Sequence, residues 1–144
     1  MCQGLDKPLY VSQELRRPLG ATFLDDIRNA ETILNCIGVL ICPELFSIGS
    51  RAIQKLNQGQ ALYAQHNNVS LWPSFFSGIE VISNRTTLPH RDPHAASTHY
   101  DFLISAGRHE EAWLELLDIK VKLSYQPCTV VAICGKVLCH AVPD

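Results

Sequence analysis

Hydrophobic residues recur at helical spacing through the first half of the chain, between residues 20 and 57. The first series contains Leu24, Ile27, Ala30, Leu34 and Ile37. After the dipeptide Cys42-Pro43, a second series contains Leu45, Ile48, Ala52, Ile53 and Leu56. Apolar positions three and four residues apart form one face of a helix, and proline rarely continues a helix. The pattern therefore predicts two helices that are separated at Cys42-Pro43, the second of them ending near Gln58-Gly59.

From residue 78 onward the apolar runs become short, and turn-forming residues separate them. The expected strands cover residues 79–83, 100–105, 120–125, 129–133 and 136–142. The third run alternates cleanly, because Val121, Leu123 and Tyr125 share one face while Lys120 and Lys122 share the other. Helical and strand patterns in successive parts of one chain predict an α+β fold, with helices packed on a small antiparallel sheet or barrel.

Length and composition indicate one globular domain over residues 1–144. Of these 144 residues 47% are apolar, which is enough for a hydrophobic core. No linker separates the helical part, residues 1–60, from the β-rich part, residues 72–142. No apolar run reaches the roughly 18 residues that a membrane span needs, so no membrane association is expected. The net charge of −2 gives no overall basic footprint for nucleic acid, and only a local basic groove would supply one.

Cysteine usage and the N-terminus indicate an intracellular protein. The six cysteines form no CxxC pair, and all except Cys2 lie in apolar stretches, as expected of small buried residues in a reducing compartment. The first residues also lack the pattern of a secretory signal peptide.

Two histidines and one aspartate form the candidate chemistry of the chain. His90 and Asp92 are two residues apart, so an extended backbone would direct both side chains to one face. His140 lies far downstream in a strand-like run. Two imidazoles and one carboxylate suit the facial triad that holds non-haem Fe(II). An ordinary interpretation stays open, because such pairs arise by chance and a lone histidine in an apolar strand is commonly a core residue.

The order of several motifs resembles the fungal branch of the TET/JBP oxygenases. The matching segments are residues 72–85 (WPSFFSGIEVISNR), 88–92 (LPHRD), 100–107 (YDFLISAG) and 123–140 (LSYQPCTVVAICGKVLCH). The resemblance extends over roughly residues 30–144 and is strongest within 72–142. Each segment alone would be weak, whereas their combined order is specific.

The resemblance implies a jelly-roll-like double-stranded β-helix that uses Fe(II), dioxygen and 2-oxoglutarate. His90, Asp92 and His140 match the family's iron ligands, and therefore its catalytic metal site. The implied activity is oxidation of the methyl group of 5-methylcytosine or thymine in a nucleic acid, most simply DNA. A protein that acts on DNA would be nuclear.

The chain also departs from the family pattern. The family's Arg for the far carboxylate of 2-oxoglutarate follows the distal His, and this sequence ends at Asp144 without it. The co-substrate-binding residue therefore stays unknown, and Lys120 or Lys122 is only a weak substitute. We expect a C-terminally shortened, incomplete β-helix with its last strand missing, and reduced or absent activity. The alternative is a catalytically dead remnant or an interaction module of the same fold.

Further residues are weaker candidates for substrate binding. His94 could approach a flipped base, although an exposed loop histidine would look the same. Asn84 could contact substrate or simply form a turn, and Tyr100 could stack near the site or pack in the core. Pro127-Cys128 replaces an expected Pro-Gly turn, so a strained backbone is predicted at Cys128.

Overall fold

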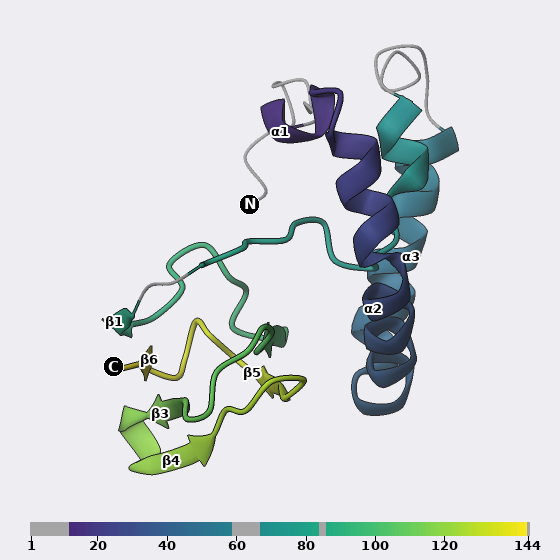
Figure 1. The fold of residues 1–144 in the computed structure, drawn as a ribbon. Helices are drawn as coiled ribbons and strands as arrows, with labels where there is room; N and C mark the ends of the chain where they lie inside the picture. Colours follow the sequence, from purple (N-terminus) through teal and green to yellow (C-terminus); the bar gives the residue numbers. More distant parts are fainter. Residues whose placement is uncertain (1–11, 59–66, 84–85, 144) are drawn as a thin grey trace. The chain divides into compact units, whose positions relative to one another are not determined.

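The structure is a computed structural model that describes residues 12–58, 67–83 and 86–143 (Figure 1). It divides into two compact units, Met1–Ile79 and Glu80–Asp144. The first contains the helices α1 (Gln13–Arg16), α2 (Gly20–Ile41) and α3 (Pro43–Gln58) and the 3-10 turn η1 (Asn67–Leu71). The second contains β1 (Thr87–His90), β2 (Asp101–Ile104), β3 (Trp113–Leu116), η2 (Leu117–Ile119), β4 (Val121–Ser124), β5 (Val130–Ile133) and β6 (His140–Val142). Each unit is described by itself below.

The boundary between α2 and α3 confirms the helix break predicted at Cys42-Pro43. Cys42 ends α2 with its backbone N–H donating to the Gly38 carbonyl oxygen at 3.0 Å, and Pro43 is the first residue of α3. Proline is favoured at a first helical position, where its missing N–H would have no helical partner. The two helices then run side by side (Figure 1).

Phe75 forms the centre of the helical unit. Its side chain is 4% exposed, and a Cβ added at Gly38 would lie 2.7 Å from the Phe75 ring. A Cβ added at Gly49 would lie 2.2 Å from the Phe75 carbonyl oxygen. Asn35 fixes the same segment, because its amide donates to the Pro73 carbonyl oxygen at 2.8 Å and accepts from the Phe75 N–H at 3.2 Å. Phe75 is thus a core residue of this unit.

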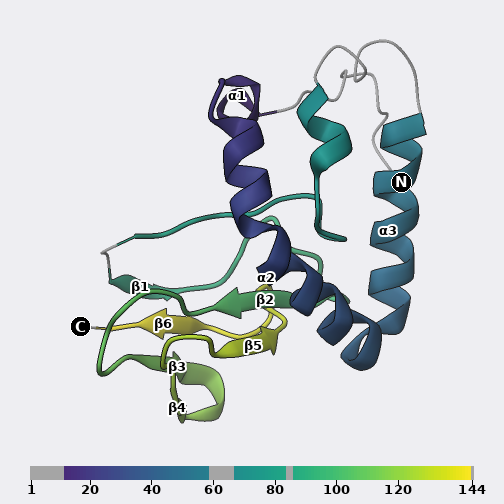
Figure 2. The same cartoon turned by 45° about the vertical axis from the view of Figure 1, so that its right-hand side comes forward.

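The strand unit contains two antiparallel sheets among the described residues. One has the strand order β1-β6-β3-β4, and the other pairs β2 with β5 (Figure 2). Antiparallel pairing brings the end of the chain beside β1, so that His90 and His140 are register partners. Leu116 of β3 is the partner of His140 on the other side. The fold is therefore α+β and consistent with a jelly-roll oxygenase, although these strands do not form a closed barrel.

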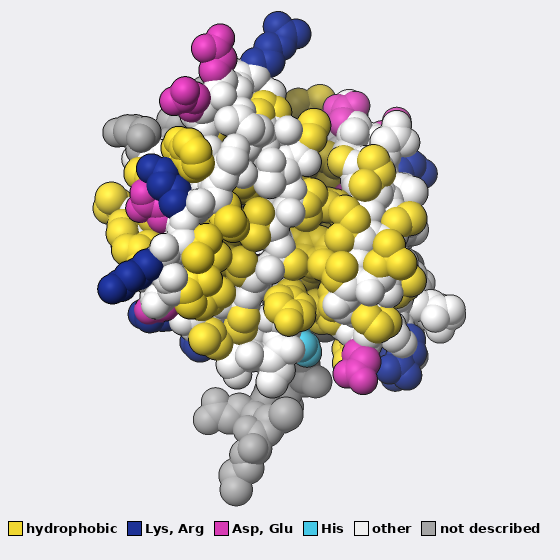
Figure 3. All heavy atoms as spheres, turned by 90° about the horizontal axis from the view of Figure 1, so that it is seen from below, with side chains coloured by type: hydrophobic (Ala, Val, Ile, Leu, Met, Phe, Trp, Pro, Cys, Tyr) yellow, Lys and Arg dark blue, Asp and Glu magenta, His cyan; other side chains and the backbone are white. Residues whose placement is uncertain are grey.

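The two sheets share one hydrophobic core. Its buried residues are Leu114, Leu116, Tyr125 and Ile133, which come from β3, β5 and the residue after β4. Other apolar side chains are exposed, as the yellow spheres of Figure 3 show, and Leu88 of β1 is 80% exposed. Singly exposed apolar residues are normal in folded proteins. The core is therefore defined by which side chains pack together rather than by apolar character alone.

Several expectations about the strands were wrong. Residues 79–83 have no regular structure, and the last strand begins at His140 rather than residue 136, because 135–138 form a turn. β1 and β3 were not predicted. Leu88 and Pro89 are exposed in β1, so its sequence shows no apolar period. In β3, Leu114 and Leu116 do alternate with less buried residues, but this short pattern was not recognised as a strand.

Two expectations about side chains and membranes can be compared with the structure. The described cysteines are all free, but Cys42 is the buried one, while Cys36 and Cys128 are exposed. The prediction that the cysteines are generally buried was therefore wrong, since an apolar neighbourhood in sequence does not fix which way one residue faces.

Within the described ranges, none of the helices combines the length and apolar character needed to cross a bilayer.

Candidate metal centre

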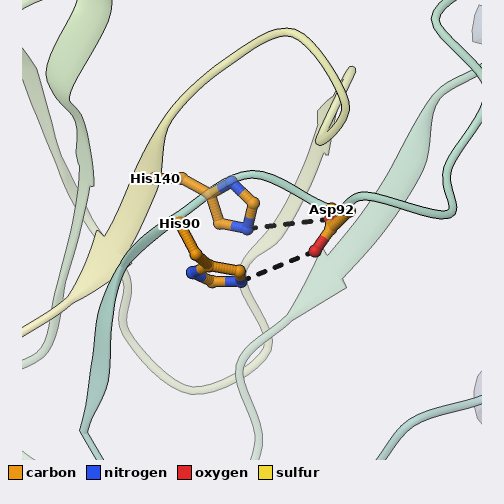
Figure 4. Close-up of side chains that lie close together, drawn as sticks. All are labelled: His90, Asp92 and His140. Atoms are coloured by element: carbon orange, nitrogen blue, oxygen red, sulfur yellow. Dashed lines mark ion pairs between the residues drawn. The ribbon is translucent and has the colours of Figure 1, made fainter.

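The strand pairing brings His90, Asp92 and His140 together (Figure 4). One ligand atom from each residue lies within 4.8 Å of the other two. The Nε2 atom of His90 is 3.5 Å from Asp92 Oδ1, and Nε2 of His140 is 3.9 Å from Asp92 Oδ2. The side chain of His140 is 5% exposed, whereas those of His90 and Asp92 are 38% and 36% exposed. The cluster thus has a buried side, formed by His140, and an open side.

Both imidazoles are oriented by a backbone carbonyl two residues earlier. Nδ1 of His90 lies 2.8 Å from the Leu88 carbonyl oxygen, and Nδ1 of His140 lies 3.0 Å from the Leu138 carbonyl oxygen. Because a carbonyl oxygen only accepts, each Nδ1 carries the proton and donates it. The lone pair of each ring is then on Nε2, the atom that faces Asp92. This is the arrangement that metal-binding histidines use to fix their tautomer.

Gly135 lies against Asp92 and is hydrogen-bonded to its backbone. Its carbonyl oxygen accepts from the Asp92 N–H at 2.9 Å. A Cβ built on Gly135 would lie 2.1 Å from Asp92 Oδ2, far closer than real atoms approach. A side chain at this position would therefore require the Asp92 carboxylate to move.

A second carboxylate, Asp101, lies behind Gly135. Its Oδ2 accepts from the Gly135 N–H at 3.1 Å and would be 2.8 Å from a Cβ on Gly135. Burial raises the pKa of Asp101 above its ordinary value, the Gly135 N–H opposes that rise, and the nearby negative charge of Asp92 adds to it. Asp101 is therefore part of the environment of the Asp92 ligand, although it does not belong to the three-residue cluster.

The donor set fits a first-row divalent metal. Two neutral imidazole nitrogens and one carboxylate oxygen are the ligands of the facial triad that binds non-haem Fe(II). Both Nε2 lone pairs are available, and the carboxylate faces both rings. The residues present are thus suited to an iron ion without rearrangement of the strand pairing.

The weaker candidates do not join this cluster. His94 is exposed, Tyr100 is 46% exposed, and Asn84 lies outside the described residues. Lys122 pairs with Glu115 at 3.5 Å and lies over the Trp113 ring at 5.1 Å, as expected of a solvated polar face. Lys120 has a left-handed backbone at the end of η2 and lies outside β4.

Sequence reasoning missed Gly135 and Asp101 as parts of the site. In the sequence Gly135 looks only like a turn residue between two apolar runs, and nothing near Asp101 marks that residue as a neighbour of Asp92. The turn after an apolar strand was the available signal for Gly135, because glycine is used where a backbone approaches another group closely.

A comparison with protein families decides the identity of the domain. The Tet_JBP family model, described as the oxygenase domain of the 2OGFeDO superfamily, matches residues 12–144. The chain belongs to the TET/JBP family. No match was found among curated proteins.

Membership of the TET/JBP family establishes the class of reaction. The superfamily consists of dioxygenases that use Fe(II) and 2-oxoglutarate, and the TET/JBP family acts on nucleic acids. The chain is therefore an oxidoreductase domain of the dioxygenase type. Among the described residues of this TET/JBP domain, His90, Asp92 and His140 form a group that could hold a metal ion.

Proposed function

We propose that the chain oxidises the methyl group of a nucleic-acid base, 5-methylcytosine or thymine, using Fe(II), dioxygen and 2-oxoglutarate, with His90, Asp92 and His140 as its iron ligands. The observation that carries the proposal is the convergence of two free Nε2 atoms on one carboxylate. Family membership supports the reaction class, and the family's action on nucleic acids supports the substrate class.

The buried side and the open side of the cluster have different roles in this proposal. When bound, Fe(II) with 2-oxoglutarate supplies the oxidising power for hydroxylation of a substrate C–H bond. His140 excludes water from one side because it is nearly buried between β1 and β3. His90 and Asp92 are more than one-third exposed, so co-substrate and base can reach the centre from their side.

Substrate contacts in this proposal come from exposed residues that lie near Asp92 or Asp101 in the sequence. His94 follows Asp92 by two residues, and Tyr100 directly precedes β2. Aromatic and imidazole rings stack on bases with little sequence preference, and they can hold a base that has left the helical stack. We also propose Asn84 as a substrate-binding residue. We propose that the nucleic acid is DNA and that the protein acts in the nucleus.

Metal and co-substrate titrations test the proposal before any turnover assay. Under anaerobic conditions, calorimetry with Mn(II), a redox-inert substitute, should show one binding site, followed by binding of 2-oxoglutarate to the Mn(II)-loaded protein. His140→Ala should abolish the Mn(II) signal. His109→Gln is the matched control, because His109 Nε2 contacts Ser105 and the Tyr125 carbonyl oxygen and lies outside the cluster.

Product analysis then tests the substrate. The Fe(II)-loaded protein should convert 5-methylcytosine or thymine in an oligonucleotide to its hydroxymethyl form, detected by mass spectrometry, and His94→Ala should weaken substrate binding without loss of Mn(II). Absence of metal binding by the unmodified chain would instead support the inactive remnant or interaction module. Metal binding with turnover of free small molecules, and none of methylated DNA, would refute the nucleic-acid substrate.

A further inference from the structure

Arg91 lies between the two ligands His90 and Asp92 and makes two contacts of its own. Its Nε donates to the Val137 carbonyl oxygen at 2.9 Å. Its Nη2 donates to Asp118 Oδ1 at 2.7 Å. The planar guanidinium suits such a double contact, because its donors point in fixed directions. The segment that contains two of the ligands is thus attached both to η2 and to the turn before β6.

Asp118 connects the same arginine to the third ligand. Its other oxygen, Oδ2, accepts from the Cys139 N–H at 2.5 Å, and Cys139 directly precedes His140. The Cys139 carbonyl oxygen in turn accepts from the Leu117 N–H at 2.9 Å. Both backbone groups of Cys139 are therefore bonded to η2. One carboxylate bridges the His90–Asp92 segment and the residue before His140.

We propose that Arg91 and Asp118 are positioning residues that set the separation between the His90–Asp92 segment and His140, and thereby tune metal affinity. This inference rests on the metal-binding part of the proposed function. Neither side chain contacts a ligand side chain in the described structure, so each acts through the backbone on which a ligand is carried.

The exposure of the pair argues against a role in stability alone. The side chains of Arg91 and Asp118 are 51% and 37% exposed, and ion pairs as exposed as this contribute little to folding. The Lys122–Glu115 pair in the same sheet is similarly exposed, at 52% and 37%. Its ion pair joins β4 to β3 and does not bridge the His90–Asp92 segment to Cys139, although the backbone of Glu115 is the register partner of Ala141 in β6. The two pairs thus differ in what they connect rather than in burial, which makes Glu115→Gln the matched control.

Metal titration of single and double variants tests the inference. Arg91→Ala and Asp118→Ala should each weaken Mn(II) binding by about tenfold, the lower end of the range seen when outer-shell partners of metal ligands are removed. The double variant should lose little more than Arg91→Ala, because either substitution breaks the same bridge between Arg91 and Cys139 and Arg91→Ala also removes the Val137 contact. Glu115→Gln should leave Mn(II) affinity unchanged, and the melting temperatures of the metal-free variants should match that control.

Conservative variants and a spectroscopic readout separate positioning from folding. Arg91→Lys and Asp118→Asn each keep part of the bridge, so their Mn(II) affinities should lie between those of the unmodified protein and the alanine variants. They also allow the measurement if an alanine variant does not fold. The visible absorption of bound Co(II), which depends on ligand geometry, should change in the alanine variants and stay unchanged in Glu115→Gln.

The outcomes distinguish this inference from the proposed function. If the unmodified chain binds Mn(II) and all Arg91 and Asp118 variants bind it within twofold as tightly, the positioning role is wrong while the metal centre stands. Additive losses in the double variant would also overturn it, since the two residues would then act separately. No Mn(II) binding by the unmodified chain would overturn the metal centre itself, and the positioning role with it.

Discussion

The helical unit and the strand unit place their central residues by different means. In the helical unit Phe75 is buried among apolar groups and lies against Gly38 and Gly49. In the strand unit the histidines and Asp92 are held by hydrogen bonds to backbone groups of Leu88, Leu138 and Gly135. Apolar burial stabilises a fold without fixing single atoms, whereas hydrogen bonds fix the direction of a ligand. Folding stability and metal affinity should therefore respond to different substitutions.

The strongest test of this contrast compares His140→Ala with Phe75→Ala. Loss of His140 removes one of three ligands, so Mn(II) binding should become undetectable by calorimetry. Loss of the Phe75 side chain should lower the free energy of unfolding by about 3–4 kcal/mol, as cavity-forming substitutions of aromatic core residues do. Because all three ligands lie in the strand unit, Phe75→Ala should leave Mn(II) affinity unchanged under conditions where the protein is folded. If either variant lost both its Mn(II) affinity and its folding stability, the two properties would not depend on separate residues.

A second test uses one glycine from each unit. In Gly135→Ala the new Cβ would collide with Asp92 Oδ2, so the ligand must move, and Mn(II) affinity should fall by roughly 10–100-fold. In Gly49→Ala the new Cβ would lie 2.2 Å from the Phe75 carbonyl oxygen, so the melting temperature should fall while Mn(II) affinity stays the same. Equal Mn(II) affinities of Gly135→Ala and the unmodified protein would show that Asp92 has another position from which it can bind.

The two units also differ in how much of them the sequence predicted. The helices followed from local periodicity and from Pro43, because helical hydrogen bonds join residues close in sequence. Strands depend on partners that are distant in sequence, and β1 and β3, which both pair with the distant strand β6, were missed. The wrong strand at 79–83 has the composition of a strand but no pairing partner among the described residues.

The candidate ligands could be picked out from the sequence, whereas the residues that contact their backbone segments could not. His90, Asp92 and His140 carry distinctive chemistry in a recognisable order, and the structure brings them together. The contacts of Arg91, Asp118 and Gly135 join segments that are distant in sequence. Nothing in their local sequence reveals which distant carbonyl or N–H they will meet.

The core of the strand unit offers a third test, at alkaline pH. Tyr125 is 8% exposed, and burial raises its pKa to about 12. In the unfolded chain the Tyr125 hydroxyl loses its proton near pH 10, whereas in the folded protein it keeps the proton until about pH 12. The free energy of unfolding should therefore be constant below pH 10 and fall by up to about 2 kcal/mol as the pH rises from 10 to 12. Urea unfolding of Tyr125→Phe should show a smaller loss over that interval. An identical pH dependence in both proteins would assign the alkaline loss to other groups.

The smallest expected effect concerns the turn before β5, where stability should change without any change at the metal centre. Cys128 has a φ of 68°, as its place in the Pro127-Cys128 turn predicted, and this left-handed conformation costs a residue with a Cβ about 1 kcal/mol. Cys128→Gly should therefore raise the free energy of unfolding by about 0.5 kcal/mol, because the greater freedom of glycine in the unfolded chain offsets part of the gain. Cys128→Ala removes the thiol but keeps a Cβ in the left-handed conformation, so its free energy of unfolding should not rise. An equal rise in both variants would show that the thiol, rather than the backbone conformation, causes the effect. Since the Cys128 N–H bonds to the Ser105 carbonyl oxygen rather than to a ligand-bearing segment, Mn(II) affinity should stay the same in both variants.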